Sequence, residues 1–190
     1  FLFDLNITER IVRESGDLSG HHVVEVGPGP GALTRSILKS KAETVTVIEK
    51  DSRFLPALKQ LQAISGDKLV IIQDDALEID IQGVETEGRP LTIIANLPYN
   101  IATPLLVRWL EAADHISGMT LMFQREVAER LTAETGTKAY GRLSVMTQWL
   151  CHPNILFHLP PSVFYPPPKV TSSVVSLIPK DIKPSNRALF

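Results

Sequence analysis

Four short segments of the chain carry residues whose types and spacing suit ligand binding. The first, residues 25–34, reads EVGPGPGALT. Gly27 and Gly29 let the backbone turn sharply and let a ligand approach to a distance at which a Cβ atom would collide. Pro28 and Pro30 remove N–H groups that would cradle a pyrophosphate, so the loop favours a nucleoside without phosphates. A tight turn that binds nothing is the alternative interpretation.

Two carboxylates follow the next two apolar runs. Glu49 ends the run 45–48, 22 residues beyond Gly27, and an acceptor-only carboxylate there suits both hydroxyls of a ribose. Asp75 comes just past the run 69–73 and suits the amino group of an adenine. The alternatives are a solvated charge at the start of a helix for Glu49 and helix N-capping for Asp75.

The fourth segment, Asn96-Leu97-Pro98-Tyr99, sets an amide oxygen, a backbone carbonyl and an aromatic ring side by side. These groups suit an adenine turned out of its stack, because its amine can donate to Asn96 and to the Leu97 carbonyl while the Tyr99 ring stacks on the base. Asn and Pro also form ordinary turns. The position of this segment after the three others favours the binding interpretation.

Hydropathy patterning predicts the scaffold that positions these segments. Apolar runs typical of strands lie at 23–26, 44–49, 69–73, 91–95, 120–123, 155–159 and 173–178. Helical patterns lie near 7–12, at 32–38, at 53–64, around 105–110 and at 126–131, and a further apolar stretch spans 143–150. This alternation predicts an α/β fold with a mostly parallel seven-stranded sheet and helices on both faces. The four segments follow strands, where ligands of such sheets bind.

The composition is that of one ordinary folded domain. The chain has 190 residues, 44% of them hydrophobic and 21% charged, with a net charge of −2, which excludes a disordered or collagen-like chain. The single cysteine, Cys151, forms no internal disulfide, and we expect it to be buried. His21 and His22 precede a strand and the other three histidines are dispersed, without a cysteine or carboxylate at ligand spacing, so no metal is expected. No run is apolar enough to span a membrane.

These segments together resemble the S-adenosylmethionine-dependent ribosomal RNA adenine dimethyltransferases. Three later segments do so too, and they read QREV at 124–127, KAYGRLSV at 138–145 and FYPPPKV at 164–170. The resemblance spans almost the whole chain. Its uninterrupted triple proline is more similar to the bacterial small-subunit branch than to the large-subunit resistance enzymes.

The resemblance implies a Rossmann-like class I methyltransferase fold. It implies dimethylation of two adjacent adenosines of small-subunit rRNA on their exocyclic amines, during ribosome biogenesis, with S-adenosylmethionine as the methyl donor and no metal. The implied cofactor contacts are Leu2, Gly27, Gly29, Glu49, Asp75, Ala76 and Asn96. The implied contacts to the target base are Asn96, Leu97, Pro98, Tyr99 and Phe164.

The resemblance also implies that residues 1–190 form the catalytic domain, without the N-terminal arm and the helical C-terminal domain of the family. We expect a cytoplasmic monomer whose partner is small-subunit rRNA or a subunit precursor. Candidate phosphate contacts are Arg108, Arg125, Arg130, Lys138, Arg142 and Lys169. We expect Trp109 and Trp149 in the core.

Two other functions remain open at this point. One is an NAD-dependent oxidoreductase that uses the same glycine loop. The other is a non-catalytic RNA-binding assembly factor or transcription factor built on the same fold.

Overall fold

The computed structural model describes residues 1–181, so residues 182–190 of the predicted domain lie outside the described part. Its strands are β1 (His22–Val26), β2 (Thr44–Ile48), β3 (Leu69–Ile72), β4 (Leu91–Ala95), β5 (Gly118–Gln124), β6 (Cys151–Leu159) and β7 (Ser172–Pro179). Its α-helices are α1 (Leu5–Glu14), α2 (Ala32–Leu38), α3 (Leu55–Ser65), α4 (Tyr99–Glu111), α5 (Arg125–Leu131) and α6 (Arg142–Leu150).

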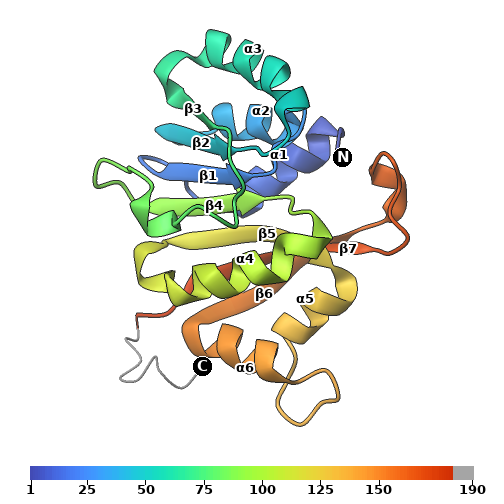
Figure 1. The fold of residues 1–190 in the computed structure, drawn as a ribbon. Coiled ribbons are helices and arrows are strands. Elements are labelled where there is room, and N and C mark those ends of the chain that lie inside the picture. The colour runs from blue at the N-terminus through green and yellow to red at the C-terminus, as the bar shows by residue number, and fades with distance from the viewer. Residues whose placement is uncertain (182–190) are drawn as a thin grey trace.

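The seven strands form one sheet in the order β3-β2-β1-β4-β5-β7-β6 (Figure 1). The five strands from β3 to β5 pair in parallel, and β7 runs antiparallel to both of its neighbours. The order reverses between β1 and β4, and ligands of open α/β sheets bind at such a switch point. The predicted mostly parallel seven-stranded sheet is confirmed.

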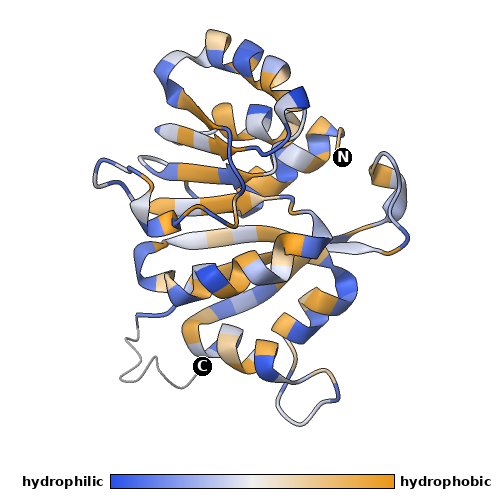
Figure 2. Ribbon diagram, viewed as in Figure 1, coloured by the Kyte–Doolittle hydropathy of each residue, from blue (hydrophilic) through white to orange (hydrophobic). Residues whose placement is uncertain are grey.

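Helices cover both faces of the sheet because successive strand residues point to opposite sides. Val24 and Ile93 belong to a core that they share with Leu106 of α4. Their chain neighbours Val23 and Ile94 belong to a second core with residues of α1, α2 and α3. Figure 2 shows mainly hydrophobic residues in these strands, interrupted by a few hydrophilic ones. A continuous apolar run, rather than an alternating one, is what burial on both faces requires.

The helix after β4 begins earlier than the sequence predicts. Its periodic pattern is clear only around residues 105–110, but α4 starts at Tyr99 with Pro98 as its N-cap. Pro104 lies inside the helix and lacks the N–H group that would bond to the preceding turn. Tyr99 therefore stands in the first turn of a helix that follows directly on β4.

One of the two predicted core tryptophans is not in the core. Trp109 is 4% exposed, which confirms the prediction for that residue, but Trp149 on α6 is 52% exposed. At about 100° per residue, Trp149 lies about 200° around the helix from Thr147, which is fully buried. The apolar pattern of 143–150 therefore identifies the helix but not which of its sides faces the sheet.

Two further predictions concern the burial of Cys151 and membrane-spanning segments. Cys151 is fully buried, as expected, and burial raises the pKa of its thiol to about 12. Within residues 1–181, every helix is too short or too polar to cross a bilayer.

Candidate functional site

The four segments singled out in the sequence lie at one edge of the sheet. Strand register places Val26 beside Ile48 and Ile48 beside Ile72. The N–H of Gly27 donates to the Ile48 carbonyl at 2.9 Å, and the N–H of Glu49 donates to the Ile72 carbonyl at 3.0 Å. The segment after β4 leaves the sheet at the same edge, because β4 is parallel to β1 (Figure 1).

Glycines in the loop after β1 adopt backbone conformations that other residues disfavour. Gly27, Gly29 and Gly31 have φ values of 68°, 54° and 85°. A Cβ atom added at Gly29 would lie 2.8 Å from the ring of Phe1, so the close approach at this position is made by Phe1. A Cβ atom at Gly27 would lie 3.5 Å from Cδ of Pro98, across the gap between the β1 and β4 segments.

Glu49 is buried and bridges two loops. It is 7% exposed, and its Oε2 accepts from the N–H of Gly29 at 3.0 Å while its Oε1 accepts from the N–H of Asp51 at 2.7 Å. The alternative of a solvated charge does not apply, since Asp51 rather than Glu49 caps the next turn. A carboxylate has about four lone-pair sites, so Glu49 can still accept two further hydrogen bonds.

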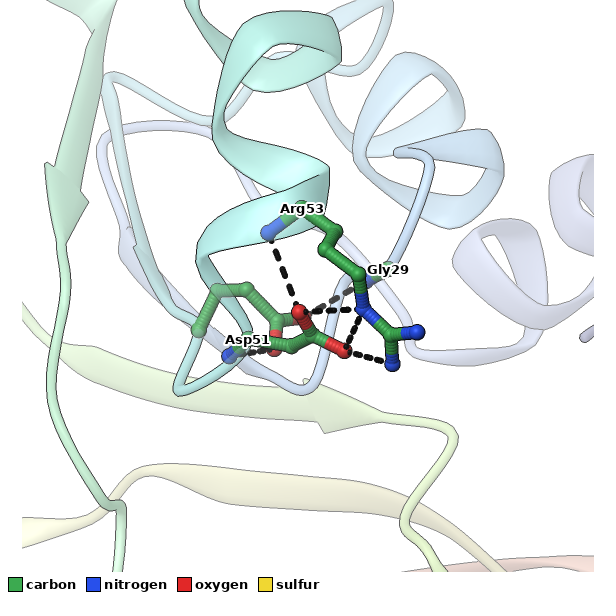
Figure 3. Close-up of polar contacts among 4 residues, drawn as sticks. Gly29, Asp51 and Arg53 are labelled. Carbon is green, nitrogen blue, oxygen red and sulfur yellow. Dashed lines mark hydrogen bonds and ion pairs between the residues drawn. The ribbon is translucent and has the colours of Figure 1, made fainter.

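The Asp51 side chain neutralises a neighbouring cation instead of pointing at the glycine loop. Figure 3 shows its carboxylate against the Arg53 guanidinium, with the backbone of Gly29 beside them. The hydrogen bonds from Arg53 lower the pKa of Asp51 to about 2. Asp51 therefore stays ionised and paired with Arg53, whereas the Glu49 carboxylate accepts from the N–H of Gly29 in the loop.

Asp75 lies past the end of β3 and is partly exposed. Its Oδ2 accepts from the Lys50 ammonium at 2.7 Å, and this hydrogen bond lowers the pKa of Asp75. Its Oδ1 accepts from the N–H of Leu77 at 3.0 Å and so caps the turn at 76–78; no helix begins there, and the helix N-capping alternative does not apply. Ala76 is buried in the core that contains Val24, Ile93 and Leu106.

A cavity of about 240 Å³ lies between the glycine loop and the segment after β4. Seven of the predicted site residues line it, and they are Leu2, Gly27, Asn96, Leu97, Pro98, Tyr99 and Phe164. Four others do not line it, and they are Gly29, Glu49, Asp75 and Ala76. The structure therefore brings the predicted base contacts together in one cavity and sets the predicted nucleoside contacts along the strand ends next to it.

The polar groups of Asn96 and Leu97 remain open to a ligand. Within residues 1–181, the side-chain amide of Asn96 and the carbonyl of Leu97 have no hydrogen-bond partner. An unpaired amide at a cavity wall has free acceptor and donor capacity. The cavity thus offers these two acceptors together with the Tyr99 ring, which is the set that the sequence predicts for an adenine.

Phe164 approaches the cavity from the loop between β6 and β7. It is buried, and its backbone forms an isolated antiparallel bridge with Leu2. The N–H of Tyr165 donates to the carbonyl of Phe1 at 2.9 Å. The start of the chain and this loop therefore close one side of the cavity together.

Glu25 opens the segment 25–34 and lines the cavity, although the sequence predicts no role for its side chain. It is 2% exposed, lines the cavity and accepts a 2.6 Å hydrogen bond from the Thr34 hydroxyl. Burial raises its pKa to about 8, and the nearby charge of Glu49 adds to the rise. Glu25 is therefore mostly protonated at pH 7. An acidic residue within the apolar run VVEV is the signal that identifies it.

Two of the six predicted RNA contacts form ion pairs with acidic residues of α5. Arg125 pairs with Glu129 at 2.7 Å and Arg130 with Glu126 at 2.6 Å, each along one side of α5. A second cavity of about 330 Å³ at the start of α6 is lined by Arg130 together with Lys138 and Arg142.

No group of three possible metal ligands occurs within the described range 1–181.

Comparison with known proteins agrees with this geometry. Residues 1–189 match the model of the family described as ribosomal RNA adenine dimethylase. The ribosomal RNA small subunit methyltransferase A of Agrobacterium fabrum is 50% identical over 184 residues, which cover 95% of this chain and 67% of that protein.

Two crystal structures share the fold closely. A dimethyladenosine transferase from Plasmodium falciparum superimposes with a TM-score of 0.84 and 31% identity, over 95% of this chain and 63% of that one. The 23S rRNA methyltransferase ErmE superimposes with a TM-score of 0.81 and 28% identity, over 95% of this chain and 70% of that one. The present chain is thus shorter than each of these relatives.

The sheet order and the site at its strand ends define a Rossmann-like class I methyltransferase. Within that class, the chain belongs to the ribosomal RNA adenine dimethylase family. The family that the sequence motifs predict is confirmed.

Proposed function

We propose that this chain transfers methyl groups from S-adenosylmethionine to the exocyclic amine of two adjacent adenosines in small-subunit rRNA, and that each becomes dimethylated. The proposal rests on the family and on relatives named for small-subunit rRNA methylation. The single observation that carries it is the cavity where the free amide of Asn96, the Leu97 carbonyl and the Tyr99 ring meet.

The residues along the strand ends fit the methyl donor. Glu49 is rigid, buried and still able to accept hydrogen bonds from two ribose hydroxyls. Asp75 stands one strand further along, where it accepts from the adenine amine of the donor. Leu2, Gly27, Gly29, Ala76 and Asn96 complete the proposed contacts. Pro28 and Pro30 leave the loop poor in N–H donors, which suits a donor without phosphates better than NAD.

The methyl donor supplies a methyl group bonded to a sulfonium sulfur. The neutral thioether that remains is a good leaving group, so the protein has mainly to align the reactants. The amine of adenine is a weak nucleophile because its lone pair is delocalised into the ring. Acceptors at Asn96 and Leu97 bind its two N–H groups and favour a more tetrahedral nitrogen. Tyr99 and Phe164 hold the faces of the base. The nitrogen loses a proton to water only after the new N–C bond has formed and the methyl–sulfur bond has broken, so no residue has to deprotonate it first.

The proposed substrate indicates the partner of the protein and the compartment in which it works. We infer that the partner is small-subunit rRNA or a precursor of the subunit, and that the protein works in the cytoplasm, where that RNA is. A single chain supplies every residue of the proposed site, so we infer that a monomer is sufficient. Residues 1–190 act as the catalytic domain in this account.

Transfer to unmethylated small subunits tests the proposal. The protein is incubated with S-adenosylmethionine and such subunits, the rRNA is digested to nucleosides, and the nucleosides are identified by mass spectrometry. We expect N6,N6-dimethyladenosine to accumulate, and Asn96→Ala to abolish the product. Failure of the wild-type protein to form any methylated adenosine would contradict the proposal.

A further inference from the structure

A hydrogen bond joins one wall of the cavity to a strand that lies far along the sequence. The Tyr99 hydroxyl lies 2.5 Å from Oγ of Ser172, which is 73 residues further along the chain. Tyr99 opens α4 after β4, whereas Ser172 opens β7 after the loop that carries Phe164. Ser172 is fully buried and does not line the cavity, so its side chain reaches the site through Tyr99.

The loop that ends at Ser172 is fixed at both ends. At its start, Phe164 bridges to Leu2. At its end, the N–H of Arg125 donates to the Thr171 carbonyl at 2.9 Å, and Ser172 is paired with Gln124 in the sheet. Ser172 is therefore a rigid point of attachment rather than a mobile side chain.

A stacking ring needs this kind of attachment. The ring of a tyrosine rotates about two side-chain torsions, and its second torsion has broad minima. Tyr99 is only partly buried, so packing alone does not fix its ring. A hydrogen bond at the hydroxyl holds the end of the ring furthest from the backbone, and a fixed ring loses less conformational freedom when a base stacks on it.

We infer that Ser172 is a positioning residue for methyl transfer, which holds the Tyr99 ring at the orientation that stacks on the target adenine. It also sets the spacing between Tyr99 and Phe164, because β7 carries the loop of Phe164. The inference rests on the proposed function and adds a residue to which neither the sequence motifs nor the cavity lining pointed.

The next residue offers a matched control. Ser173 is also fully buried, and its Oγ lies 2.8 Å from Nδ1 of His158 on β6. Successive strand residues point to opposite faces of a sheet, so this hydrogen bond is directed away from Tyr99. Ser173→Ala therefore removes a comparable buried hydrogen bond without touching the cavity wall.

The test compares Ser172→Ala, Tyr99→Phe, their double variant, Ser172→Thr and Ser173→Ala. Each is assayed for kcat and KM with unmethylated subunits, for affinity toward S-adenosylmethionine and for thermal unfolding. A short RNA with 2-aminopurine at the target position reports stacking on Tyr99 through quenching of its fluorescence.

We expect Ser172→Ala to lower kcat about tenfold and to weaken the fluorescence quenching, with unchanged affinity for the methyl donor. Tyr99→Phe should behave alike, and the double variant should be no worse than either single one, because all three remove the same bond. Ser172→Thr keeps a hydroxyl and should restore most of the activity. Ser173→Ala should lower the unfolding temperature to a similar extent and keep kcat within twofold.

Equal kcat and equal quenching in the wild-type protein and in Ser172→Ala would overturn the inference. So would an equal loss in Ser173→Ala, which would show a merely structural effect. If Ser172→Ala does not fold, Tyr99→Phe decides, because that change leaves β7 intact. No methylation by the wild-type protein would contradict the proposed function itself, and the inference with it.

Discussion

The backbone N–H of Gly29 donates a 3.0 Å hydrogen bond to the carboxylate of Glu49, which ties the loop after β1 to the end of β2. The same carboxylate accepts from the N–H of Asp51. Two backbone donors fix its orientation before any ligand arrives, so a ligand that uses its remaining lone pairs does not have to order it.

Replacing Glu49 should weaken binding of the methyl donor. Glu49→Ala removes the proposed acceptor for both ribose hydroxyls, and we expect a loss of roughly 1–3 kcal/mol, the range for hydrogen bonds to a charged group. Calorimetric titration with S-adenosylmethionine measures it. Asp51→Asn is the control, because the Asp51 side chain faces Arg53, and it should bind within twofold of the wild-type protein. Unchanged affinity in Glu49→Ala would refute the ribose assignment.

Replacing Asn96 should affect catalysis far more than folding. Its amide has no protein partner within residues 1–181, so Asn96→Ala breaks no intramolecular hydrogen bond. We expect transfer to fall by about 100-fold or more, the scale of removing one group that stabilises the transition state. Asn100→Ala, at an exposed position in the first turn of α4, is the control and should keep full activity. Single-turnover methylation rates of the two variants decide between a catalytic amide and a turn former.

Glu25 should make stability depend on pH. Its pKa is raised from 4.5 to about 8 in the folded protein, so folding binds a proton between these values. The resulting stabilisation is complete below pH 4.5 and is lost as the pH rises through 8. Glu25→Gln stays neutral and still accepts from Thr34.

Urea unfolding at pH 5 and pH 9 measures this effect. Wild-type protein should lose roughly 4 kcal/mol more between these pH values than Glu25→Gln does. Glu134→Gln changes an exposed acid and should keep the wild-type dependence. Identical pH dependence in wild type and Glu25→Gln would mean that Glu25 is ionised in the fold.

A side chain at Gly31 should destabilise the fold. Its φ of 85° disfavours other residues, and a Cβ atom there would lie 2.6 Å from Cδ1 of Leu61. Gly136 has a φ of 87° with open space around it, so Gly136→Ala isolates the backbone term of about 1 kcal/mol. We expect Gly31→Ala to cost about 2–4 kcal/mol in chemical unfolding. Equal costs for the two variants would show that the contact with Leu61 relaxes freely.

The strands and the strand-end segments could be predicted from sequence because each has a local signal. Apolar runs mark β1 to β5, and Glu49 and Asn96 directly follow such runs. The residues that follow these strands could then be grouped into one site without coordinates, since the carboxyl ends of parallel strands lie on the same side of the sheet.

Other features depend on contacts between distant segments, and no local pattern carries them. The bond between Tyr99 and Ser172 joins residues 73 positions apart. The exposure of Trp149 depends on which side of α6 meets the sheet. The raised pKa of Glu25 depends on complete burial, which the run VVEV suggests only once the sheet is known to be covered on both faces.

A structure with S-adenosylhomocysteine bound tests the central claim most directly, which is that consecutive strand ends form one site for the methyl donor. We predict that the adenosine lies along the ends of β2 and β3, with its ribose hydroxyls on Glu49 and its amine at Asp75, and that the sulfur points toward Asn96. Binding elsewhere, such as in the cavity lined by His22 and Arg89, would contradict the account.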